Sequence, residues 1–140
     1  MRQYLIVANR TVESPQLLEA IRERLGPEPA RFHLLVPEDH LQGMTWEEGQ
    51  ARVAAKHRLA HAIEYFAGLG IEMTGDVDTT PVDGVANILV REGQDHFDEI
   101  LISTLPTTVS RWFKMDAPTR IQRLTSVPVT HIASVMEPTS

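Results

Sequence analysis

The sequence contains no cysteine among its 140 residues. A disulfide framework, a cysteine nucleophile and a thiolate metal site are therefore excluded. Long apolar runs are absent as well: the run near the N-terminus covers residues 4–8, which is shorter than the core of a signal peptide or a membrane span. We therefore expect a soluble, cytoplasmic protein without a membrane partner.

Positive charge is scarce. The 13 lysine and arginine residues are outnumbered by 19 aspartate and glutamate residues, which gives a formal net charge of −6. Non-specific binding to nucleic acid needs clustered cations that replace condensed counterions. We therefore expect no nucleic-acid partner.

Short apolar segments alternate with helical patterns along the chain, which is typical of βαβ units on a parallel sheet. Right-handed crossovers between five strands predict a doubly wound α/β fold with strand order 3-2-1-4-5 and helices on both faces. We expect one domain over residues 1–140, with a disordered tail at 136–140. The five predicted strands cover residues 5–8, 31–36, 71–77, 99–103 and 127–132.

Four helices are expected. Ser14 and Pro15 mark the start of the first, and the third covers residues 82–92. Thr45 and Glu48 form a capping box for the second helix, and Asp116 is the predicted N-cap of the fourth. The predicted buried face of the second helix consists of apolar residues at helical spacing: Val53, Leu59, Ala60, Ile63, Phe66 and Ala67.

The predicted topology places a ligand site at the carboxyl ends of the first and fourth strands. In this strand order the two neighbouring strands are the switch point, where ligands of doubly wound sheets bind. The candidate lining residues at these predicted strand ends are Asn9, Arg10, Thr11, Ser103, Thr104 and Pro106, with Val36 at the end of the second strand.

The order of elements and the segment after the fourth strand resemble the universal stress protein family. That family carries a phosphate motif of glycine, two residues, glycine, nine residues, glycine, and then serine or threonine. In this chain the four motif positions fall on Ser103, Pro106, Asp116 and Ala117, so the spacing matches while the residues differ. Where the family has an aspartate after the first strand, this chain has Asn9.

These departures weaken a phosphate site of the family's kind. Pro106 lacks a backbone donor, and the conformational freedom of glycine is lost at three positions. A capping Asp116 carboxylate would occupy the helix end and repel a phosphate. We therefore expect no cofactor. The alternative is ATP or AMP with magnesium, held in a rearranged loop by Arg111 and Lys114.

Other residue patterns carry less chemistry. His57 and His61 lie four apart in the second predicted helix, with Glu64 on the same side, a spacing that can ligate zinc but that lacks a dedicated third ligand. No G-x-S-x-G elbow surrounds Ser103 or Thr104, and no histidine is placed by sequence to activate either hydroxyl. We expect a non-enzyme with weak ATP hydrolysis at most, and no metal site.

Three functional interpretations stay open. The first is a regulatory or small-ligand-binding protein with a degenerate nucleotide site. The second is a nucleotide-binding stress protein, and the third is a protein-interaction scaffold. In each case we expect a homodimer through the edge strand, because an uncharged edge needs a partner. The edge residues are Val127, Val129, Thr130 and Ile132.

Overall fold

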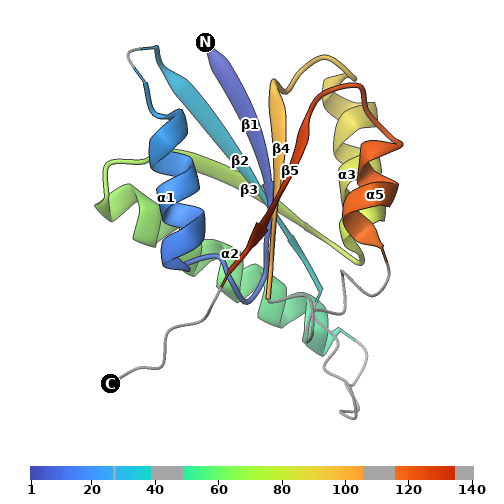
Figure 1. Cartoon of the computed structure of the whole chain (residues 1–140). Helices are drawn as coiled ribbons and strands as arrows, with labels where there is room; N and C mark the ends of the chain where they lie inside the picture. The colour runs from blue at the N-terminus through green and yellow to red at the C-terminus, as the bar shows by residue number, and fades with distance from the viewer. Residues whose placement is uncertain (27, 39–48, 106–115, 135–140) are drawn as a thin grey trace.

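The computed structural model describes residues 1–26, 28–38, 49–105 and 116–134. Its strands form a five-stranded sheet in the order β3-β2-β1-β4-β5, and every neighbouring pair is parallel (Figure 1). The strands are β1 Arg2–Val7, β2 Ala30–Pro37, β3 Met73–Asp78, β4 Glu99–Thr104 and β5 Val129–Ala133. The predicted strand order is confirmed.

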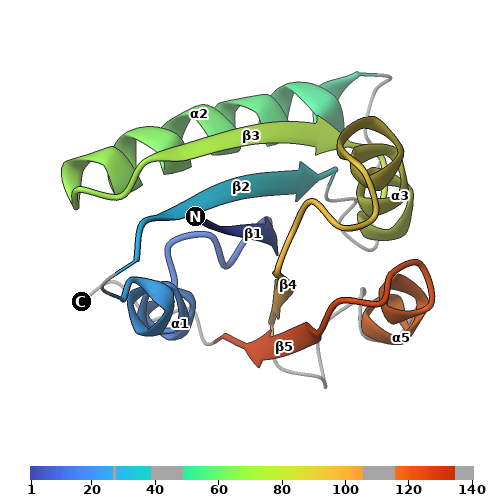
Figure 2. The ribbon, with the colours of Figure 1, turned by 90° about the horizontal axis from the view of Figure 1, so that it is seen from above.

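Helices cover both faces of the sheet, as Figures 1 and 2 show. Helices α1 (Pro15–Arg24) and α2 (Gln50–Gly68) pack on one face, and α3 (Pro81–Glu92) and α5 (Ala117–Gln122) pack on the other. Alternate residues of the central strands serve the two cores: Ile6 faces the first pair of helices, whereas Leu5 and Val7 face the second. Strands β1 and β4 are buried on both faces, which explains their continuous apolar sequences.

One predicted helix start is confirmed, and the predicted capping box of the second helix lies outside the described residues. The Ser14 hydroxyl accepts a hydrogen bond from the Leu17 backbone N–H at 3.1 Å, so the predicted cap of α1 is confirmed. Helix α2 begins at Gln50 after Gly49, whose φ of 89° is left-handed and suits a residue without a side chain. Thr45 and Glu48, the predicted capping box, lie outside the described residues.

The buried face of α2 differs from the predicted one. Val53 is 53% exposed, and Ala60 and Ala67 are also exposed. The residues that face the sheet are mostly small and recur every three or four positions: Ala51, Ala55, Ala62 and Phe66, with Leu59 partly buried. Phe66 and Leu59 were therefore predicted correctly, whereas the buried alanines were missed, because small residues add little hydrophobicity although they let the helix approach the strands closely.

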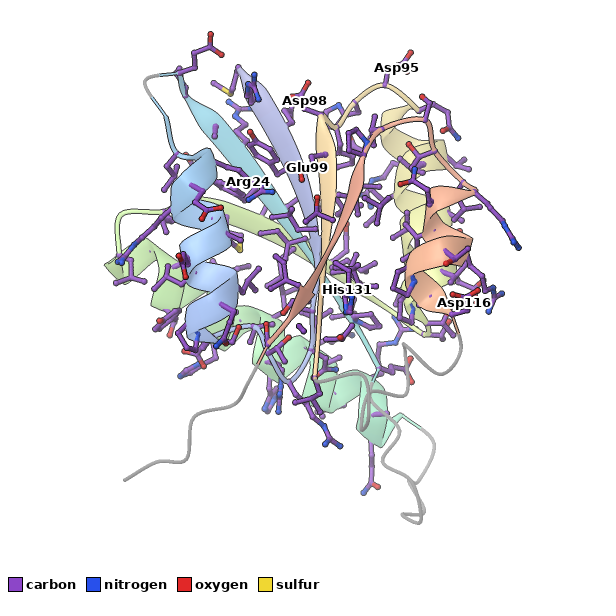
Figure 3. The ribbon with its side chains drawn as sticks, in the orientation of Figure 1. Arg24, Asp95, Asp98, Glu99, Asp116 and His131 are labelled. Carbon is purple, nitrogen blue, oxygen red and sulfur yellow. The ribbon has the colours of Figure 1, made fainter. Side chains whose placement is uncertain are left out.

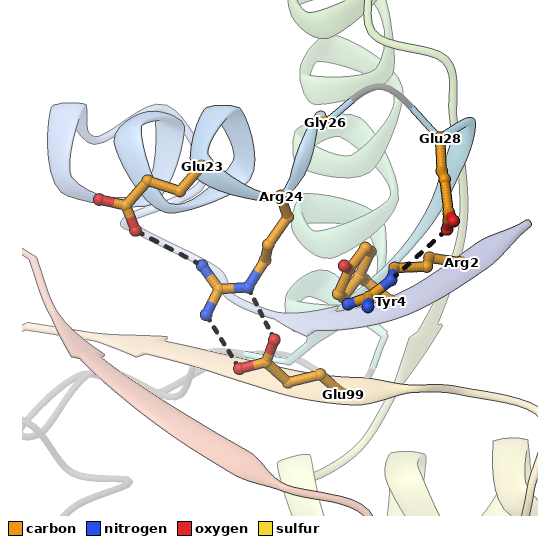
Figure 4. A pocket seen from close by; sticks show the side chains of 7 residues that line it. All are labelled: Arg2, Tyr4, Glu23, Arg24, Gly26, Glu28 and Glu99. Carbon is orange, nitrogen blue, oxygen red and sulfur yellow. Dashed lines mark hydrogen bonds and ion pairs between the residues drawn. The ribbon is translucent and has the colours of Figure 1, made fainter.

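The amino ends of the strands are joined to α1 by one charged pair. Arg24 donates from Nε and Nη2 to the two carboxylate oxygens of Glu99, at 2.7 and 2.9 Å (Figure 4). The Thr130 hydroxyl donates to the same carboxylate. These bonds hold the pKa of the Glu99 carboxyl below its ordinary value, and the Arg24 contribution is the largest. The pair therefore connects α1, β4 and β5 at the amino ends of the strands, opposite to their carboxyl ends.

Candidate functional site

The carboxyl ends of β1, β2 and β4 bring several predicted site residues together. Asn9 follows β1 and is 6% exposed, and its side-chain amide donates to the carbonyl oxygen of Pro37 at the end of β2. The backbone carbonyl of Asn9 accepts from Arg58 Nη1 at 3.4 Å. Asn9 thus ties β1 to β2 and to α2, and its amide N–H is already used within the protein.

A chain of buried hydroxyl groups fills the space between β1, β4 and β5. Thr11 Oγ1 lies 2.7 Å from Ser103 Oγ, and Ser103 Oγ lies 2.7 Å from Ser134 Oγ. Ser134 Oγ in turn lies 2.9 Å from Ser14 Oγ, the cap of α1. None of these four residues exposes more than 2% of its surface. We call this set, Thr11, Ser14, Ser103 and Ser134, the hydroxyl chain.

The direction of the hydroxyl chain follows from its two ends. Thr11 donates to the carbonyl oxygen of Ser103, which only accepts, so Ser103 must donate to Thr11. Ser134 then donates to Ser103, and Ser14 donates to Ser134 while it accepts from Leu17 N–H. Every hydroxyl proton in the chain therefore has an acceptor, and the Ser103 side chain occupies the position of the first motif glycine.

Thr104 has a histidine partner that the sequence did not indicate. Thr104 Oγ1 lies 2.7 Å from His131 Nε2, and it donates its single proton to the Leu105 carbonyl at 2.8 Å. His131 must therefore donate its Nε2–H to Thr104. Desolvation lowers the pKa of His131, whose position on β5 is seen in Figure 3. The imidazole positions Thr104 and does not act as a base toward it.

The start of α5 differs from the prediction. Asp116 occupies the N-cap position of α5 (Figure 3), but its backbone is left-handed, with φ 57° and ψ 37°, and its side chain makes no capping hydrogen bond. The predicted carboxylate cap is wrong because a side-chain cap requires an extended N-cap backbone, as at Ser14. Ala117 is 1% exposed and packs in the core beside Ile121.

Of the remaining predicted site residues, some lie in the described part of the structure and others lie outside it. Val36 is fully buried in the core between the sheet and the first helix pair, and Arg10 is partly buried beside α2. Pro106, Arg111 and Lys114 lie outside the described residues.

One of the two α2 histidines, His61, pairs with a carboxylate outside its own helix. Glu13 Oε2, in the segment after β1, lies 3.4 Å from His61 Nδ1. Within residues 1–26, 28–38, 49–105 and 116–134, no group of three or more histidine, aspartate or glutamate side chains is placed to hold a metal ion. In the same residues, no helix is long and apolar enough to cross a membrane.

Sequence reasoning missed Ser14, Ser134 and His131 as partners of the site. No spacing links them, since Ser14 and Ser134 lie at opposite ends of the chain. The predicted strand order could have indicated this contact. Because β5 is parallel to β4 and ends beside it, a polar residue after β5 meets Ser103 and Thr104.

The strand order and the switch point between β1 and β4 define the class: this chain has the doubly wound α/β fold of the universal stress proteins. No family model matches the sequence, and no curated protein sequence matches it.

Several solved structures are similar to this chain over nearly its whole length. A universal stress protein from Archaeoglobus fulgidus in complex with dAMP is 17% identical, with a TM-score of 0.57 over 94% of this chain and 98% of that one. A universal stress protein family protein from Arabidopsis thaliana with AMP bound is 12% identical, with a TM-score of 0.59 over 96% and 93%. A universal stress protein in complex with cAMP is 10% identical, with a TM-score of 0.60 over 96% and 98%. At these identities the likeness establishes the fold.

Proposed function

We propose that this protein is a universal-stress-protein-like, small-ligand-binding regulator whose nucleotide site is degenerate. One observation carries the proposal: Ser103, at the first glycine position of the family motif, is fully buried and bonded to Thr11 and Ser134. The strand end that a phosphate loop would leave open is filled by side chains. A protein of this kind does not hold ATP in the family's usual mode.

Ligand binding is supported by the structural neighbours, some of which hold AMP, dAMP or cAMP. The shared fold favours the same edge of the sheet as the place for a ligand. The polar side chains there are engaged with one another, which favours binding over catalysis. A nucleotide in a rearranged loop and a protein-interaction scaffold are the competing interpretations.

Titration calorimetry with Mg-ATP at fixed salt tests the degenerate site. We expect weak binding to the natural sequence and at least about tenfold tighter binding to a variant that combines Ser103→Gly, Pro106→Gly, Asp116→Gly and Ala117→Ser. The changes restore glycine freedom and a hydroxyl at the helix start, and tenfold corresponds to about 1.4 kcal/mol, no more than one charge-assisted hydrogen bond.

A second variant separates the contribution of the strand-end positions, Ser103 and Pro106, from that of the helix start. Asp116→Gly with Ala117→Ser leaves the hydroxyl chain intact, and we expect it to stay weak. Circular dichroism and a melting curve confirm folding of each variant, and added ligand should raise the melting temperature of a variant that binds. Tight binding by the natural sequence would overturn the degenerate-site proposal in favour of the nucleotide-binding interpretation.

We also propose a homodimer through β5. This strand is an edge of the sheet, its residues Val129, Thr130 and Ile132 are half-buried, and it contains no lysine, arginine, aspartate or glutamate. An unprotected edge strand pairs with another strand, and a second copy offers an identical one.

Light scattering at tens of micromolar should give twice the mass of one chain. Ala133→Pro should give the monomer mass: the Ser134 N–H donates to β4, so the preceding Ala133 N–H points to the open edge, where proline removes a donor. A monomer without any substitution would contradict the proposal.

A further inference from the structure

A groove of about 810 Å³ lies between the segment that follows β1 and helix α2. Its apolar wall includes Val12 and Leu18, and the partly buried ring of Tyr65 lines it from α2. A groove of this volume is large enough for a small organic molecule, and its apolar wall can cover a ring or an alkyl chain.

The charges along this groove are predominantly positive. Arg10 and Glu13 line it from the segment after β1, and His57, Arg58 and His61 line it from α2. The lining residues of α1, Pro15 and Leu18, carry no charge. Among the described lining residues, two arginines against one carboxylate give a formal charge of +1. This balance is opposite to the charge of −6 of the whole chain.

The arrangement of these groups favours an anion over a metal ion. Arg58 approaches the Asn9 carbonyl at 3.4 Å, which orients its guanidinium along the start of the groove. The side chain of His61 is 71% accessible beside Glu13, which is 37% accessible, so the imidazole has room to turn toward a ligand. Guanidinium and imidazolium groups both donate to oxyanions, and guanidinium matches them with two parallel bonds.

We propose that the groove is a binding site for a small organic oxyanion, an apolar body that carries a phosphate or sulfonate group. The oxyanion contacts Arg58 and Arg10, and the apolar body lies on the wall that includes Val12 and Leu18. The imidazoles of His57 and His61 line the same groove and offer further N–H donors to the oxyanion. The site lies beyond the filled strand end and shares only Arg10 with the candidate nucleotide site.

Fluorescence titration with 2-naphthalenesulfonate at pH 7.5 and fixed salt tests the site, and we expect saturable binding. The neutral analogue 2-naphthylmethanol should bind at least tenfold more weakly, because it offers the same apolar body without the oxyanion. No saturable binding of the sulfonate, or equal affinity for the two probes, would overturn the proposal.

Variants locate the probe within the groove. Arg58→Gln should weaken binding at least fivefold, and the double variant His57→Gln with His61→Gln should weaken it by less than Arg58→Gln does. Glu13→Gln should tighten binding severalfold, since among the residues that the structure describes Glu13 is the carboxylate that lines the groove. Arg22→Gln, an exposed arginine of α1 outside the groove, is the matched control and should leave the affinity unchanged. Binding that resists Arg58→Gln, or that Glu13→Gln fails to strengthen, would contradict the assignment.

Discussion

Replacing Glu99 by alanine is expected to lower the free energy of unfolding by about 2 to 3 kcal/mol. The substitution leaves the Arg24 guanidinium without its two-bond partner and removes the acceptor of Thr130, so α1, β4 and β5 lose their shared contact. Breaking a fully buried pair costs about 3 to 5 kcal/mol. The effect here is smaller because both side chains keep 18% exposure. Urea denaturation at pH 7 measures it.

The same carboxyl makes stability depend on acidity. The folded pKa of Glu99 is lowered, chiefly by Arg24, so its contribution is complete above the unfolded pKa and disappears as the pH falls through the folded pKa. Glu99→Gln should therefore lose less stability than the natural sequence when the pH is lowered from 6 to 3.

Glu23→Ala is the matched control for Glu99→Ala. This exposed glutamate meets the same arginine at 3.8 Å, and its replacement should change stability by less than about 0.5 kcal/mol. Equal losses in the Glu23 and Glu99 variants would contradict the role of the pair.

Replacing Ser134 by alanine should cost about 2 kcal/mol. The substitution removes the middle of the hydroxyl chain, so the Ser14 proton loses its acceptor and Ser103 loses its donor inside the protein. An unsatisfied buried polar group costs about 1 to 3 kcal/mol. Urea denaturation is again the measurement, and an unchanged slope shows that the native and unfolded states keep their compactness.

The exposed Ser126 offers a control for this substitution. Ser126→Ala alters the same chemistry on the surface and should change stability by less than about 0.5 kcal/mol. A double variant of Ser134→Ala with Thr11→Val should cost less than the sum of the two single changes, because both residues belong to one network. Strict additivity would show that the four hydroxyls do not act as a unit.

Residue order alone determines the architecture of this protein. Continuous apolar segments identified the central strands β1 and β4, the alternation of strands and helices predicted the order 3-2-1-4-5, and Ser14 before Pro15 predicted a helix start. These features depend on neighbouring residues and on general rules of handedness, so they can be inferred without distant contacts.

Only the tertiary structure decided how the strand ends are filled. Ser14, Ser103 and Ser134 meet because β4 and β5 end beside the start of α1, and no local pattern records that meeting. The set of α2 residues that faces the sheet likewise depended on how closely a row of alanines approaches the strands, and the left-handed backbone of Asp116 has no signal in the sequence. Contacts between residues far apart in sequence depend on exact distances between packed elements, and these distances arise only when the whole sheet and its helices come together.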